Sequence, residues 1–184
     1  VQEAAEIASL TVEILDVEQL VIEKAYSEVA SQLRLGTDDV VALVDIGASV
    51  ITLNVMKNGR SIYLRSAPFD AKYLEKELVR RMGSSSEDAM SALRNQDYPE
   101  EFEEKVIEPY RESLAQNISR LLQFFFSGAE YSTVSKLLLT GGGANTIGLP
   151  EILEDRLGIT VHIANPLASM SLGGGVKGPE LAAQ

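Results

Sequence analysis

The stretch that decides the fold is residues 40–60, which read V-V-A-L-V-D-I-G-A-S-V-I-T-L-N-V-M-K-N-G-R. An apolar run leads into Asp45, three small residues follow at 47–49, and a second apolar run ends at Asn58 and Gly59. Asn-Gly between two such runs is typical of a tight hairpin turn, because both central residues need a positive φ. We therefore predict two strands within this stretch and a third over 61–66.

The turn that follows Asp45 has the composition of an anion site. Gly47, Ala48 and Ser49 carry little side chain, so their amides can approach a phosphate closely. A carboxylate at the end of a strand can hold a divalent cation, usually through its waters. Phosphate with a bound cation fits both halves of the pattern. An ordinary hairpin with an aspartate in its turn fits as well, and this stretch by itself leaves both interpretations open.

Composition restricts the classes of function. The 184 residues suffice for one domain, or for two small lobes that share a sheet. The absence of Cys excludes disulfides and thiol catalysis, and the single His162 excludes histidine-rich metal sites. A net charge of −11 argues against a nucleic-acid surface, and no apolar run reaches the roughly 20 residues that span a bilayer. These features predict a cytoplasmic protein.

Helical periodicity indicates most of the remaining elements. We expect helices over 3–9, 16–33, 73–82 and 87–93, a strand over 11–15, and a long helix over 99–129 that Pro109 kinks or begins. Asp16 is placed to cap the second of these helices, and Ser84 with Glu87 forms a capping box for the fourth. The phenylalanines at 124–126 are expected in the core, and His162 is expected to be structural.

A second glycine turn follows a buried strand. The strand over 134–139 meets Thr140-Gly-Gly-Gly-Ala-Asn145, and a helix over 149–157 and a strand over 159–164 come next. Three glycines in succession cost conformational freedom and are kept where the backbone must come very near something. Ligands of such α/β crossovers lie at the carboxyl ends of the strands, so both glycine turns should meet at one edge. Residues 173–184 lack periodicity and are expected to be a loose tail.

These residues resemble a known family. Asp45-Ile-Gly-Ala-Ser49 with Thr52, followed by N-G-R-S-I-Y, resembles the second phosphate motif of the actin-like ATPase fold. The run L-L-T-G-G-G-A over 138–144, with G-L at 148–149, resembles its adenosine motif. The segments L-D-V-E at 15–18, S-R-L-L-Q-F-F-F-S at 119–127 and V-H-I-A-N-P-L-A-S-M at 161–170 are similar to the type IV pilus assembly protein PilM family.

The resemblance implies an α/β fold: an actin-like, ribonuclease H-like lobe whose mixed sheet has flanking helices and a smaller inserted helical subdomain. It divides the chain into a connecting helix-strand-helix segment (1–36), the second lobe (37–66 and 110–172), the inserted subdomain (67–109) and a flexible tail (173–184). The first lobe of the family would precede Val1, so we expect weak or undetectable ATP binding by this chain in isolation.

The resemblance also implies ATP and Mg²⁺ as cofactors. Asp45 would bind the metal, and together with Gly47, Ala48, Ser49 and Thr52 it would face the β/γ-phosphates. The adenosine would lie against Gly141, Gly142, Gly143 and Ala144, with residues 87–94 matching a helix that contacts ribose or adenine in relatives. Asp16 would be the catalytic carboxylate near the attacking water, with Glu18 as the alternative.

The implied role is a cytoplasmic ATP-binding scaffold with at most slow hydrolysis. Its partners would be the cytoplasmic tail of PilN and the pilus motor or platform proteins, which would place it at the inner membrane without insertion into the bilayer. A phosphotransferase of the sugar-kinase type, an FtsA-like filament former and a type II secretion scaffold are the alternatives. One departure concerns the segment after the third strand, where the family usually has Gly-Gly and this chain has Asp70-Ala71. A carboxylate there would either repel phosphate or cap the next helix.

Overall fold

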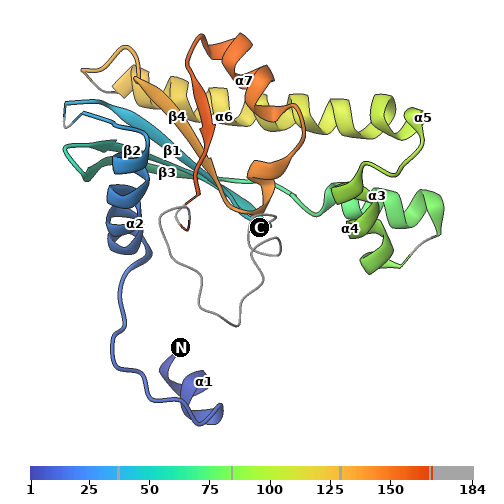
Figure 1. The fold of residues 1–184 in the computed structure, drawn as a ribbon, viewed down its shortest axis with the longest axis horizontal. Coiled ribbons are helices and arrows are strands. Elements are labelled where there is room, and N and C mark those ends of the chain that lie inside the picture. The colour runs from blue at the N-terminus through green and yellow to red at the C-terminus, as the bar shows by residue number, and fades with distance from the viewer. Residues whose placement is uncertain (37, 84, 129, 166, 168–184) are drawn as a thin grey trace.

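The computed structural model describes residues 1–36, 38–83, 85–128, 130–165 and 167, and its centre is a mixed sheet with helices on both faces (Figure 1). The strand order is β3-β2-β1-β4-β5. The strands are β1 Val41–Ile46, β2 Val50–Lys57, β3 Arg60–Pro68, β4 Lys136–Thr140 and β5 Val161–Ile163. β1, β2 and β3 pair antiparallel, whereas β4 is parallel to both β1 and β5. The expected mixed α/β sheet is confirmed.

The β2–β3 hairpin forms where the sequence predicts it. Asn58 and Gly59 have φ values of 53° and 72°, the two positive values that the tight turn needs. The hairpin carries a bulge where the register shifts between Val55 and Met56.

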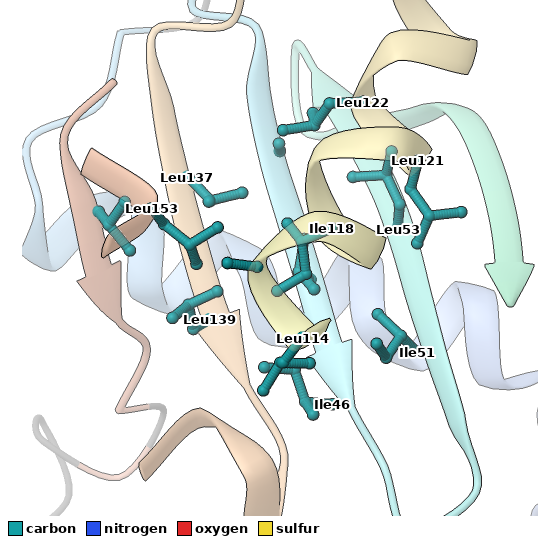
Figure 2. Close-up of a cluster of buried hydrophobic side chains, with 14 of the residues drawn as sticks. Ile46, Ile51, Leu53, Leu114, Ile118, Leu121, Leu122, Leu137, Leu139 and Leu153 are labelled. Atoms are coloured by element: carbon teal, nitrogen blue, oxygen red, sulfur yellow. The ribbon is translucent and has the colours of Figure 1, made fainter. Parts of the chain in front are cut away.

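One long helical segment covers one face of the sheet. It consists of α5 Glu100–Phe102, a π-helical turn η1 Glu103–Ile107 and α6 Glu108–Gly128. The π turn ends two residues before Pro109, which cannot donate a backbone hydrogen bond, so the predicted irregularity takes this form. Figure 2 shows side chains of α6 directed at the strands, with α7 Leu149–Leu157 at the side. The labelled residues of this core are Ile46, Ile51, Leu53, Leu114, Ile118, Leu121, Leu122, Leu137, Leu139 and Leu153.

The other face is covered by α2 Glu18–Gln32. Tyr26 and Val29 of this helix pack in one cluster with Val41, Leu43 and Leu138 of the sheet. The first turns of α2 do not share in this burial, since Leu20 and Val21 are about half exposed, at 48% and 49%. The helix thus covers the amino-terminal half of β1 and β4 and leaves their carboxyl ends open.

The helices between β3 and α6 have a core of their own. α3 Tyr73–Met82 and α4 Ser86–Asn95 pack with α5 and η1 around Leu78, Ala89, Phe102, Val106 and Ile107. Gly83 ends α3 with a φ of 64°, as expected. The cap of α4 is Ser85, one residue later than predicted, and its hydroxyl accepts a bond of 3.1 Å from the Asp88 amide.

The division of the chain into subdomains stays a prediction. The expected tail at 173–184 lies outside the described residues. Among the residues that the structure describes, no helix is both long and apolar enough to cross a bilayer.

Two predictions at the amino-terminal end are wrong. After α1 Gln2–Ile7, residues 11–15 form no strand, and within the described chain no strand pairs with them. Their β-forming residues have no neighbouring strand, among the described residues, to which their backbone groups could hydrogen-bond, and Ile14 and Leu15 are exposed. Asp16 does not cap α2, because the cap position is Val17 and has no side-chain cap bond. Asp16 instead accepts a bond from the Val17 amide at 2.9 Å and pairs with Lys24 at 2.7 Å.

Candidate functional site

Strand pairing brings four polar side chains into one row at the open edge of the sheet. Asp45 of β1 is opposite Thr52 of β2 and Thr140 of β4, and Thr52 is opposite Ser66 of β3. Residues paired across strands point to the same face. The row therefore runs Ser66–Thr52–Asp45–Thr140, and the hydroxyl oxygens of Thr52 and Ser66 lie 3.0 Å apart.

The row lies on the face of α2, beyond the part that this helix covers. Side chains alternate along a strand, so Asp45 shares a face with Leu43, which packs in the α2 cluster. Asp45, Thr52 and Thr140 are partly exposed and Ser66 is exposed. A ligand can reach these groups without displacing the core.

The turn after β1 offers two amides to an anion. The Gly47 amide is used within the turn, where it donates to the Val50 carbonyl at 3.0 Å. Ala48 and Ser49 are exposed, and no backbone carbonyl of the described residues accepts a hydrogen bond from their amides. Of the three predicted phosphate-facing amides, those of Ala48 and Ser49 are the ones that the geometry leaves available.

The second glycine turn packs against the end of β1. Gly141 has a φ of 82°, and a Cβ added there would lie 2.6 Å from both the Ile46 carbonyl oxygen and the Asp45 Oδ1. A Cβ on Gly143 would overlap the Ile46 side chain, whereas a Cβ on Gly142 would meet no atom of the described residues within 4 Å. The sequence predicts that the backbone of these glycines lies very close to another group. For Gly141 and Gly143 that group is the end of β1.

Within the second turn, only part of the predicted adenosine surface is open. The side chain of Ala144 is buried in the main core at 1% exposure, so only its backbone can face a ligand. Gly141 and Gly142 are exposed, and Gly142 borders open space.

Arg111 of α6 links the second turn to the inserted helices, and sequence analysis missed this residue. Its Nη1 donates to the Ile147 carbonyl at 2.8 Å, and its Nη2 donates to Glu103 Oε1 at 3.0 Å. The Tyr98 hydroxyl donates to the other oxygen of Glu103 at 3.0 Å. Burial, followed by this hydrogen bond, raises the pKa of Tyr98 to about 12. The guanidinium lies over Gly148, which leaves no room for a Cβ there.

Asp70 lies beside the first turn. Its neighbours Phe69 and Ala71 donate backbone hydrogen bonds of 3.0 and 3.1 Å to the carbonyls of Ser49 and Ala48. The Asp70 carboxylate pairs with Lys76 at 2.8 Å, and this hydrogen bond holds the pKa of Asp70 below its usual value. Asp70 does not cap α3, because the cap position is Lys72 and has no side-chain cap bond.

The predicted catalytic carboxylate is engaged on its own segment. Asp16 contacts Val17 and Lys24, and the hydrogen bond from Lys24 lowers the pKa of Asp16. Neither contact joins it to the row around Asp45. The role assigned to Asp16, or to Glu18 in its place, stays a prediction.

Comparison with known proteins shows the family of the chain. The family model for type IV pilus assembly protein PilM matches residues 1–184. The chain belongs to the PilM family. The expected relationship is confirmed, and the PilM-like segments at 15–18 and 119–127 lie at the junction of the linker with α2 and in α6.

Solved structures show the fold of this PilM-family chain to be actin-like. The chain resembles a PilM-PilN type IV pilus biogenesis complex, with a TM-score of 0.77, 23% identity, and coverage of 97% of this chain and 51% of that one. An archaeal actin homologue gives a TM-score of 0.60 at 19% identity, with 83% and 50% of the chains covered. MreB 5 of Spiroplasma citri bound to AMPPNP gives 0.55 at 12% identity, with 83% and 61% covered. The chain thus spans about half the length of the first two.

The row and the two turns fit a magnesium nucleotide chemically. No group of three His, Cys, Asp or Glu side chains that could enclose a metal occurs among the described residues. Asp45 would therefore be the protein's carboxylate on a cation that keeps waters and phosphate oxygens as its other ligands, which is the habit of Mg²⁺. The hydroxyls of Thr52 and Thr140 flank Asp45 and can bond to such waters.

Proposed function

We propose that this PilM-family chain forms one wall of a Mg-ATP site and acts as a scaffold of the type IV pilus inner-membrane assembly complex. The observation that carries the proposal is the row centred on Asp45, which lies at the carboxyl edge of the sheet between two partly exposed glycine turns. The actin-like fold supports it, since the MreB 5 relative is a structure bound to AMPPNP.

In this proposal each part of the edge has a separate task. Bound Mg²⁺ would supply the positive charge that the β/γ-phosphates need. Asp45 holds the cation, Thr52 and Thr140 orient its waters, and the amides of Ala48 and Ser49 donate to phosphoryl oxygens. The backbone at Gly142 leaves open space for the adenosine.

The role of nucleotide in such a scaffold is conformational. ATP can favour a closed arrangement only by the difference between its affinities for the open and closed states. We expect slow turnover or none, because Asp70, the described carboxylate beside the first turn, is paired with Lys76, and Asp16 is paired with Lys24.

The proposed partners follow from the family and from the structural relative. That relative is a complex of PilM with PilN. We propose that the present protein binds the cytoplasmic tail of a PilN protein, meets the motor or platform proteins of the pilus, and is held at the membrane through these partners.

Calorimetric titration of Mg-ATP tests the nucleotide proposal. The full-length protein is compared with its Asp45→Ala variant and with Asp155→Ala, which removes a carboxylate from an exposed position on α7. We expect binding by the wild type and by Asp155→Ala, and its loss in Asp45→Ala. Equal binding by all three proteins, or by none, would contradict the assignment of the site.

A further inference from the structure

Asp70 and Lys76 form a charged pair beside the first turn. The nucleotide site proposed above assigns no role to this pair. Asp70 lies between the two residues whose amides bond to the carbonyls of Ala48 and Ser49. These are the residues whose own amides are left available for an anion. Asp70 is therefore the residue between the two backbone hydrogen bonds that hold this segment against the turn.

The carboxylate keeps its negative charge throughout the neutral pH range. Its bond to Lys76 lowers the pKa of Asp70, and the charge also acts on Tyr110, where burial and then Asp70 raise the pKa to about 12. Lys76 is on the first turns of α3, so the positive end of that helix and the ammonium group face the same region. The backbone bonds of residues 69 and 71 thus bring one repelling and one attracting charge close to the first turn.

We propose that Asp70 and Lys76 set the affinity and the phosphate-number preference of the nucleotide site, with Asp70 opposing a polyphosphate and Lys76 offsetting it. The inference rests on the nucleotide site proposed above and concerns how that site is tuned. Because the proposed site holds the β- and γ-phosphates at the first turn, beside Asp70, this carboxylate disfavours Mg-ATP more than Mg-ADP, and AMP least. Loss of the Asp70 charge would therefore raise the affinity for Mg-ATP most, for Mg-ADP less and for AMP least.

The test is a set of titrations of the full-length protein with Mg-ATP, Mg-ADP and AMP at two salt concentrations. Asp70→Asn removes the charge and keeps the shape, Lys76→Met removes the ammonium, and Asp155→Asn is the control for loss of one charge elsewhere. We expect Asp70→Asn to bind Mg-ATP about fivefold more tightly than the wild type, as a screened charge contact at an exposed site allows. Lys76→Met should bind it more weakly, and both effects should shrink at high salt.

The possible outcomes separate this inference from the site itself. Binding that depends on Asp45 but is equal or weaker in Asp70→Asn than in Asp155→Asn overturns the role of the pair and leaves the site intact. An equal gain for all three nucleotides also overturns it. If no variant binds nucleotide, both proposals fail. Both positions are exposed, and thermal unfolding of each variant checks that the fold is retained.

Discussion

Alanine substitutions in the second glycine turn test whether the end of β1 shapes that turn. At Gly141 two effects coincide, since a Cβ would lie 2.6 Å from the Ile46 carbonyl oxygen and the φ of 82° disfavours any side chain. Three other glycines separate the effects. Within the described part of the chain, Gly143 has only the overlap with Ile46, Gly158 has only the positive φ of 64°, and Gly142 has neither.

The expected losses of stability follow from these two effects. Left-handed backbone costs an alanine about 1–2 kcal/mol. Overlap with packed atoms costs about 1–3 kcal/mol. Gly141→Ala should therefore lose roughly 2–5 kcal/mol, Gly143→Ala roughly 1–3 and Gly158→Ala roughly 1–2. Gly142→Ala should be neutral, or more stable by up to about 1 kcal/mol, because alanine restricts the unfolded chain.

Equilibrium unfolding in urea measures these differences, with the midpoint and the slope recorded for each variant. We expect the order of destabilisation to be Gly141→Ala first and Gly142→Ala last, without a change in slope. If Gly141→Ala costs no more than Gly158→Ala, the turn does not contact the Ile46 carbonyl and the packing described above is wrong. Nucleotide is left out of the assay, so the result does not depend on the proposed function.

Three further predictions concern other parts of the fold. The pKa of Tyr110 is about 12 in the folded protein and near 10 in the unfolded chain, so the free energy of unfolding should fall as the pH rises between these values. Urea midpoints measured across this pH range should fall less in Tyr110→Phe, which has no ionisable hydroxyl. Arg111→Met should lower the free energy of unfolding by about 1–3 kcal/mol, whereas Arg120→Met on the exposed side of α6 should change it little. Ser85→Ala should cost about 1 kcal/mol by loss of the α4 cap, measured by thermal unfolding.

Local patterns in the sequence were sufficient for most of the elements. The Asn58–Gly59 turn, the end of α3 at Gly83 and the long apolar stripe before β4 each depend on residues that are near one another in the chain. The two glycine turns were expected at one edge of the sheet, and the parallel pairing of β1 with β4 places them there. Local chemistry encodes such features directly, because turns and periodicity are properties of a few consecutive residues.

Predictions failed or were incomplete where distant residues decide the outcome. The run at 11–15 has the composition of a strand, but composition does not supply a neighbouring strand. Ser66 and Thr140 were not recognised beside Asp45, because only strand register brings them together. Arg111 could not be found either, since its partner Ile147 lies on a separate element.

The sequence by itself determined the order and type of the main elements, the family resemblance and the two glycine turns as candidate phosphate and adenosine segments. The tertiary structure alone decided which groups at those turns are available. It engages the Gly47 amide, buries Ala144, places Gly141 against Ile46 and sets Asp70 next to Ala48 and Ser49. The physical reason is that hydrogen-bond partners and close contacts across a sheet depend on register between distant segments, which no local pattern specifies.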